Sequence, residues 1–76
     1  MLRYTVLVSL EDGTYIVDVP ALPGCHTVGD TLAEAIDNAR EAIAAYLEAL
    51  EARGEAIPTD VETQAIRVDV ASPRAA

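Results

Sequence analysis

Residues 31–54 read TLAEAIDNAREAIAAYLEALEARG, and this stretch decides how the rest of the chain must fold. Thr31 and Glu34 have the spacing of a capping box, in which the threonine hydroxyl accepts a backbone N–H of the first turn. Gly54 is a natural helix end, because glycine adopts the left-handed conformation without penalty. The pattern predicts a helix of roughly 22 residues, about 33 Å long. Its apolar side chains recur every three or four residues and form one stripe: Ile36, Ala39, Ile43, Tyr46, Leu47 and Leu50.

The stretch before the helix predicts a β-hairpin. Residues 2–10 and 14–19 alternate between two faces, and Asp12-Gly13 between them favours a two-residue turn. With that turn, three apolar pairs lie on one face of the sheet: Leu10 with Tyr15, Val8 with Val17 and Val6 with Val19.

Two further strands complete the expected sheet. A short strand at 25–28 follows the proline-interrupted segment 20–24, and residues 63–70 alternate again after the helix. Because a helical crossover joins parallel neighbours, the last strand is expected beside the first, with Ile66 and Val68 under the helix. The predicted fold is α+β with the order βββαβ, a four-stranded mixed sheet with one long helix packed on one face. Residues 1–71 are expected to form this single domain, and residues 72–76 a flexible C-terminal tail.

Composition restricts the partners. The chain has 76 residues and a net charge of −8, with five cationic side chains, all arginine and widely spaced. Clustered cations are needed to bind phosphates, so direct nucleic-acid binding is not expected and a basic protein partner is favoured. A core without Phe or Trp is thin, which favours a homodimer or homotetramer. A single cysteine, no evident signal peptide and no membrane-spanning run predict a cytoplasmic protein.

Residues 15–35, YIVDVPALPGCHTVGDTLAEA, resemble the N-terminal domain of the HicB antitoxin family. The similarity continues through the loop 54–58. The resemblance implies a partial RNase-H-like fold without nuclease activity, and neutralisation of a small basic mRNA-cleaving toxin, HicA, by direct protein binding. Full antitoxins usually continue into a DNA-binding domain, so operator binding by residues 1–76 alone is not expected. The residues that carry the family's motif are Pro20, Leu22, Pro23, Gly24, Cys25, Gly29, Thr31, Glu34 and Gly54.

The sheet face away from the helix is the candidate partner surface. Leu7 and Ile16 are expected to form an apolar spot ringed by charge there. The predicted partner-binding set is Leu7, Ile16, Asp18, Pro23, Gly24 and His26. A second interpretation treats the segment 20–25 as a rigid strand connection, in which prolines fix φ, Gly24 permits a tight turn and Leu22 plugs the core.

No metal, cofactor or catalytic site is predicted. Cys25 and His26 have no further Cys or His to complete a zinc site, and neighbouring residues of a strand point to opposite sides. The implied fold raises the alternative of a remnant RNase-H-like hydrolase, whose candidate acids are Asp18, Asp30, Glu34 and Asp69.

The four acids also have simpler roles. Asp30 and Glu34 suit a helix N-terminus. The other two, Asp18 and Asp69, are expected to pair with Arg3 or Arg67. The remaining alternative function is an orphan oligomeric scaffold module that has no toxin partner.

Overall fold

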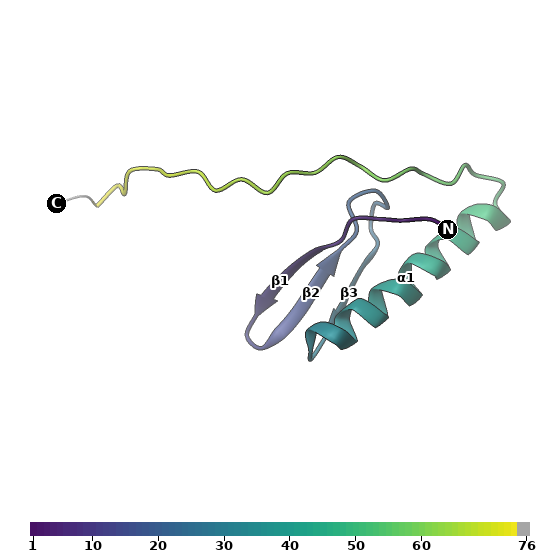
Figure 1. Ribbon diagram of the computed structural model, residues 1–76, viewed down its shortest axis with the longest axis horizontal. Helices are drawn as coiled ribbons and strands as arrows, with labels where there is room; N and C mark the ends of the chain where they lie inside the picture. Colours follow the sequence, from purple (N-terminus) through teal and green to yellow (C-terminus); the bar gives the residue numbers. More distant parts are fainter. Residues whose placement is uncertain (75–76) are drawn as a thin grey trace.

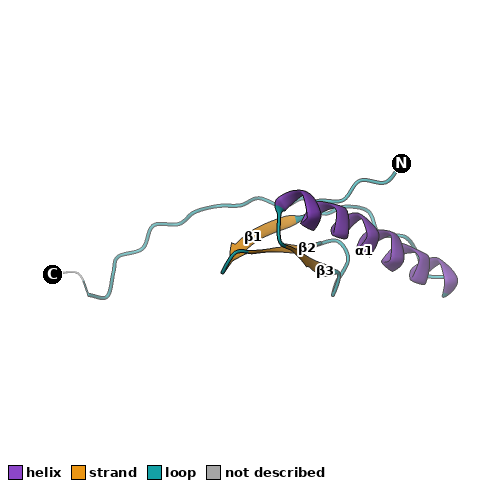
Figure 2. Cartoon of the chain, turned by 90° about the horizontal axis from the view of Figure 1, so that it is seen from below, coloured by secondary structure: helices purple, strands orange, loops and turns teal. Residues whose placement is uncertain are grey.

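The computed structural model describes residues 1–74 and contains three strands followed by one long helix (Figure 1). The strands are β1 (Leu7–Glu11), β2 (Thr14–Asp18) and β3 (His26–Gly29), and the helix is α1 (Leu32–Ala52). The strands form one antiparallel sheet in the order β1-β2-β3, and α1 lies across one face of it (Figure 2). The predicted α+β class is confirmed, but the sheet has three strands and is not mixed.

The β1–β2 hairpin follows the predicted turn and register. Asp12 and Gly13 have φ values of 49° and 77°, as a type I′ turn requires. Two of the three predicted apolar pairs, Leu10 with Tyr15 and Val8 with Val17, are in the ladder. The third pair lies outside it, because β1 begins only at Leu7.

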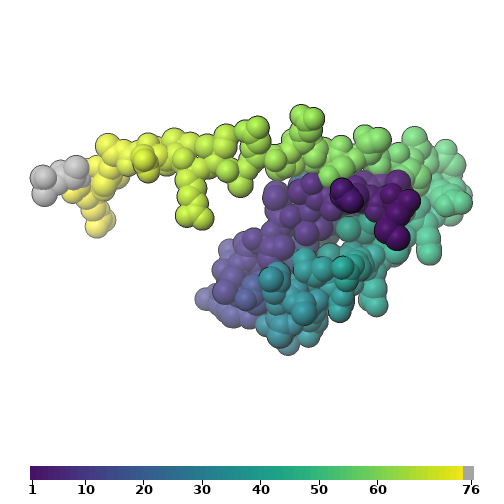
Figure 3. Space-filling model, viewed as in Figure 1, coloured from purple at the N-terminus to yellow at the C-terminus, as the bar shows by residue number. Residues whose placement is uncertain are grey.

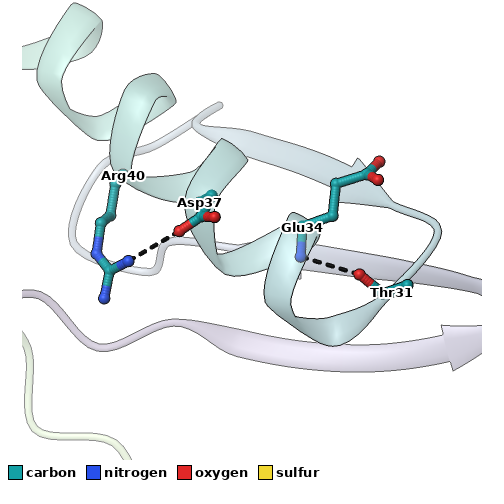
Figure 4. A network of polar contacts seen from close by, with 4 residues as sticks. All are labelled: Thr31, Glu34, Asp37 and Arg40. Atoms are coloured by element: carbon teal, nitrogen blue, oxygen red, sulfur yellow. Dashed lines mark hydrogen bonds and ion pairs between the residues drawn. The ribbon is translucent and has the colours of Figure 1, made fainter.

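The N-terminus of α1 is capped by its own first turn (Figure 4). The Glu34 N–H donates to the Thr31 hydroxyl at 3.1 Å. The Glu34 carboxylate accepts from the Asp30 N–H at 3.3 Å, one residue earlier than an ideal capping box would place this bond. The predicted capping residues therefore act as caps.

The C-terminus of α1 ends in a Schellman motif. Gly54 has a φ of 70°, and its N–H donates to the Glu51 carbonyl at 3.0 Å. The N–H of Glu55 donates to the Leu50 carbonyl at 2.9 Å. These bonds satisfy carbonyls that a helix end otherwise leaves without partners. The predicted helix is confirmed at a length of 21 residues.

The β2–β3 connection is rigid and closes one end of the core. The Cys25 N–H donates to the Leu22 carbonyl at 2.9 Å, across a turn with Pro23 second and Gly24 third. Gly24 has a φ of 81°, which makes this a type II turn. The Tyr46 hydroxyl of α1 donates to the Pro23 carbonyl at 3.0 Å, and Leu22 is fully buried, as predicted.

The core lies between α1 and β2 and continues into this connection. Val17 of β2 is fully buried against Ala35 and Ala39 of α1. A second cluster consists of residues from the connection and the later turns of α1: Val19, Leu22 and Cys25 against Ala42, Ile43, Tyr46 and Leu47.

The helix lies close to β3 and leaves β1 uncovered. A Cβ atom at Gly29 would lie only 2.5 Å from the backbone nitrogen of Ala35, so glycine is what permits this approach. At the opposite edge of the sheet, Val8 and Leu10 of β1 point to the same face as Val17, but they remain 40% and 58% exposed. The helix-facing side of the sheet is therefore only partly covered.

The predicted fourth strand is wrong for the single chain. Residues 61–74, here called the arm, extend away from the body without a ladder partner (Figures 1 and 3). The arm starts beside the N-terminal segment, where the Tyr4 hydroxyl donates to the Pro58 carbonyl at 2.6 Å. The backbone N–H and hydroxyl of Thr5 donate to the Asp60 carboxylate at 2.9 and 2.7 Å. If the arm continued from this contact as a strand parallel to β1, it would reach the end of β1 at Glu11 before most of its alternating apolar residues had a neighbour.

Ile66 and Val68 consequently do not lie under the helix, and they are 72% and 76% exposed. Of the expected C-terminal tail at 72–76, residues 75 and 76 lie outside the described part of the chain.

Candidate functional site: the open face of the sheet

The candidate site is the sheet face turned away from α1, here called the open face. Directly paired residues of antiparallel strands point to the same side, so the register gives the rows of this face. The row nearest the β2–β3 connection contains Leu7, Asp18 and His26, and the next row contains Ser9, Ile16 and Val28. The structure thus brings together four of the six predicted partner-binding residues: Leu7, Ile16, Asp18 and His26.

An apolar diagonal crosses the open face. Leu7 and Ile16 are diagonal neighbours, as predicted, and Val28 lies directly opposite Ile16 on β3. Leu7 is 43% exposed and Val28 is 51% exposed, while Ile16 between them is half-buried. Sequence reasoning missed Val28. The alternation of β3 contained the signal, because an inward Cys25 places His26 and Val28 together on the other side.

Polar side chains flank this diagonal. Asp18 and His26 are exposed and lie directly opposite each other on β2 and β3. Such a cross-strand pair has its Cβ atoms about 4.5–5.5 Å apart. The acceptor Asp18 and the imidazole of His26 therefore form one polar end of the open face.

Pro23 and Gly24 do not lie in the rows of the open face. They form the exposed tip of the β2–β3 connection, beyond the row of Leu7, Asp18 and His26. The bond from Tyr46 ties this tip to α1. The structure therefore supports the rigid-connection interpretation of this segment, with its tip next to the polar end of the open face.

The expected pairing of Asp18 and Asp69 with Arg3 or Arg67 is wrong for residues 1–74. Ion pairs in this part of the chain join sequence neighbours instead, Arg40 with Asp37 at 2.9 Å (Figure 4) and Arg53 with Glu55 at 3.0 Å. Arg67 and Asp69 lie in the arm, away from Asp18. The solvent side of α1 is acidic, because exposed carboxylates follow one another along the helix: Glu34, Glu41, Glu48 and Glu51.

Cys25 and His26 occupy opposite sides of the sheet. The Cys25 thiol is buried in the core, and desolvation raises its pKa, so the reactive thiolate is disfavoured at neutral pH. Across residues 1–74, no three His, Cys, Asp or Glu side chains are grouped to hold a metal ion. The helical part of the described chain offers no segment with the length and hydrophobicity needed to cross a membrane.

Comparison with known proteins gives the family. A model described as the HicB-like antitoxin of the bacterial toxin–antitoxin system matches residues 4–74. The chain belongs to the HicB-like antitoxin family. The prediction made from residues 15–35 is thus confirmed.

One similar solved structure is a HicB antitoxin domain, and the curated relatives of this HicB-like chain are UPF0150 proteins. The crystal structure of the N-terminal domain of the Burkholderia pseudomallei antitoxin HicB is similar, with a TM-score of 0.68 and 41% identity over 76% of this chain and 69% of that one. A UPF0150 protein of Thermoplasma acidophilum is 53% identical over 60 residues, which are 78% of this chain and 87% of that protein. A UPF0150 protein of Synechocystis is 48% identical over 59 residues, 76% of this chain and 75% of that protein.

Proposed function

We propose that this HicB-like protein is a non-catalytic antitoxin that binds a small, basic toxin of the HicA type through its open face. Family membership supports an antitoxin role, and the observation that carries the choice of surface is the exposed Leu7–Ile16–Val28 diagonal beside Asp18. The RNase-H-like relationship belongs to the same proposal. So does the cytoplasmic location, since the mRNA that such a toxin cleaves is cytoplasmic.

The charge and the apolar diagonal have different roles in this binding. A net charge of −8 attracts a basic partner over distance and raises the association rate, an effect that salt weakens. Apolar side chains that become buried at the centre of an interface slow dissociation. A cationic toxin surface with an apolar centre would thus match the open face.

The open face is also preorganised for binding. Ile16 and Asp18 lie on β2, which is held by a strand on each side, and the fully buried Val17 between them anchors β2 to α1. The Tyr46–Pro23 bond fixes the connection at the polar end. A rigid surface loses little conformational entropy when it binds, which favours affinity.

The test starts with recovery of the partner. Tagged protein purified from its own cytoplasm is expected to bring down a small basic protein in stoichiometric amount. Binding of that protein is then measured by calorimetry with Leu7→Ser and with the control Leu32→Ser. Leu32 is 51% exposed and lies at the start of α1, not in the rows of the open face.

Leu7→Ser is expected to weaken binding about 10-fold, as for removal of an apolar anchor worth about 1.4 kcal/mol, while Leu32→Ser leaves it unchanged. Equal affinities for the two variants would contradict the choice of surface. Recovery of this protein alone would instead favour the orphan scaffold. Metal-dependent RNA cleavage that Asp18→Asn abolishes would favour the hydrolase.

A further inference from the structure

An apolar groove lies between the N-terminal segment, residues 1–6, and α1. Its volume is about 610 Å³, and pockets that bind small molecules measure about 300–1,000 Å³. One wall, here called the α1 wall, consists of helix side chains at three- and four-residue steps, and the other wall consists of residues 1–4 and Val6. The α1 wall is made by Ile36, Arg40, Ile43, Ala44 and Leu47. Helix geometry makes this wall about 16 Å long.

Apolar side chains in this groove remain accessible to water. Within residues 1–74, α1 packs closely on β2 and β3 but not on β1, so the sheet does not fill the space beside the helix. Leu2 is 60% exposed, and Ile36, Ile43 and Leu47 are half-buried. A hydrocarbon chain laid along the α1 wall would remove these side chains from water, which is favourable in proportion to the apolar area covered. The groove therefore fits an elongated apolar molecule.

The charges in the groove are opposite in sign to the charge of the whole chain. The net charge is −8, yet two of the five arginines, Arg3 and Arg40, line the groove. Within residues 1–74, none of the acidic side chains does. The hydroxyl of Tyr4, the other polar side chain in the lining, already donates to the Pro58 carbonyl at 2.6 Å. The side-chain donors left for a ligand are therefore two guanidinium groups, which bind carboxylates.

Both arginines have donors available for a ligand. Arg3 takes part in no ion pair within residues 1–74. Arg40 donates to Asp37 at 2.9 Å through one nitrogen, and the two side chains are 75% and 74% exposed (Figure 4). An exposed pair of this kind contributes little stability, and a guanidinium has several N–H donors. Arg40 can therefore bind a second carboxylate, or exchange Asp37 for it.

We propose that the groove binds a free alkyl carboxylate, the class of molecule to which fatty acids belong. Its hydrocarbon chain lies along the α1 wall and its carboxylate is bound by Arg3 and Arg40. An alkyl cation would meet two charges of its own sign there. An anionic membrane surface is repelled by the net charge of −8, so a free molecule is favoured over a lipid headgroup. The proposal does not depend on the toxin, because the groove contains none of the residues in the rows of the open face.

Calorimetry with probes that differ in chain length or in head group tests the binding. The protein carries its tag at the C-terminus, because Met1 lines the groove. Decanoate below its micelle concentration is expected to bind with a Kd of about 100 μM. Octanoate, which is shorter by two CH₂ groups, is expected to bind about tenfold more weakly.

Decyltrimethylammonium has the same chain length as decanoate and the opposite charge. The net charge of −8 alone would favour this cation, so a preference for the anion identifies the arginines of the groove. The cation is expected to bind at least about tenfold more weakly than decanoate. Equal affinities for the two probes would overturn the proposal, as would no binding of decanoate at about 1 mM.

Matched substitutions test whether the groove is the site. Arg40→Gln removes a cation from the groove, and the control Arg53→Gln removes the same charge from an exposed ion pair outside it. Ala44→Glu places a carboxylate in the groove, and the control Ala45→Glu places one at the neighbouring exposed position, which does not line it. Each test variant is expected to weaken decanoate binding about tenfold, and each control to stay within about threefold of wild type. Equal affinities within either pair of folded variants would overturn the proposal.

Two further measurements distinguish the free carboxylate from other occupants. Nuclear Overhauser contacts are expected between the methylene protons of decanoate and the methyl groups of Ile43 and Leu47, whereas contacts to Leu7 and Val28 alone would place the probe on the open face and overturn the proposal. Phosphatidylglycerol vesicles are expected not to retain the protein. Retention that Arg40→Gln abolishes would assign the groove to a membrane surface and overturn the proposal. A second copy of the chain that covered the groove and excluded decanoate would overturn it as well.

Discussion

Gly29→Ala replaces a hydrogen atom with a methyl group at the point where β3 lies closest to α1. The new Cβ would lie 2.5 Å from the nitrogen and 2.7 Å from the Cα of Ala35. Carbon atoms in favourable contact are about 3.5–4.0 Å apart, so the helix must move by about 1 Å. Overpacking of this kind typically costs about 1–3 kcal/mol. A domain of this length has a total stability of only ~4–11 kcal/mol, so a substantial part would be lost.

Urea unfolding, followed by circular dichroism at one fixed protein concentration, measures this loss. The midpoint is expected to fall while the slope stays the same. Gly54→Ala is the matched control, because a Cβ there meets nothing within 4 Å. Its φ of 70° costs about 1–2 kcal/mol through the backbone alone, without a change in helix–sheet packing. Nuclear magnetic resonance shifts of α1 should accordingly move in Gly29→Ala and not in Gly54→Ala.

A double variant separates backbone contact from side-chain contact. Ala35→Gly removes a methyl group that would lie 3.0 Å from the new Cβ, but it leaves the closer nitrogen and Cα in place. Gly29→Ala combined with Ala35→Gly is therefore expected to be no more stable than Gly29→Ala. The reasoning would be refuted if the double variant recovered the wild-type free energy of unfolding. It would also be refuted if Gly29→Ala alone stayed within about 0.5 kcal/mol of wild type.

Two further predictions concern the core and the start of the arm. Leu22→Ala empties a fully buried position and is expected to cost about 2–5 kcal/mol in the same urea assay, whereas Leu32→Ala, at a half-exposed position, costs far less. The N–H and hydroxyl of Thr5 lower the pKa of Asp60 below 3.8, so the stability that these bonds supply is present above pH 3.8 and is lost as the pH falls through the folded pKa. Thr5→Ala is expected to move the pKa of Asp60 up toward 3.8 in a carboxyl carbon titration, and an unchanged pKa would contradict the role of the hydroxyl.

The parts of the fold that sequence predicts well are those whose cause is local. Asp12-Gly13 forces a two-residue turn, and that turn alone fixes the register of β1 against β2. Thr31, Glu34 and Gly54 act within a few residues of themselves, so both ends of α1 follow from the sequence. Leu7, Ile16 and Asp18 follow from the same register, and the alternation of β3 adds His26 to their side of the sheet, which is why these four residues could be grouped in advance.

The parts that sequence misses depend on partners distant in the chain. Residues 63–70 have the alternation of a strand, but alternation does not specify which edge, or whose edge, the strand pairs with. Residues 2–6 alternate too, yet β1 starts at Leu7 because the opposite strand ends at Asp18, before Pro20. Arg40 and Arg53 pair with near neighbours, whereas the predicted pairs of Asp18 and Asp69 depended on the position of a fourth strand that is not in the sheet.

The arm also decides where a protease would first cut the chain. Proteases cleave extended, accessible backbone, and residues 61–74 of a solitary copy present such backbone outside the body. Cleavage there would leave the sheet and α1 intact, because the described strands and core clusters contain none of these residues. Limited proteolysis of the chain is therefore expected to remove the arm first and to leave the folded body as the surviving fragment.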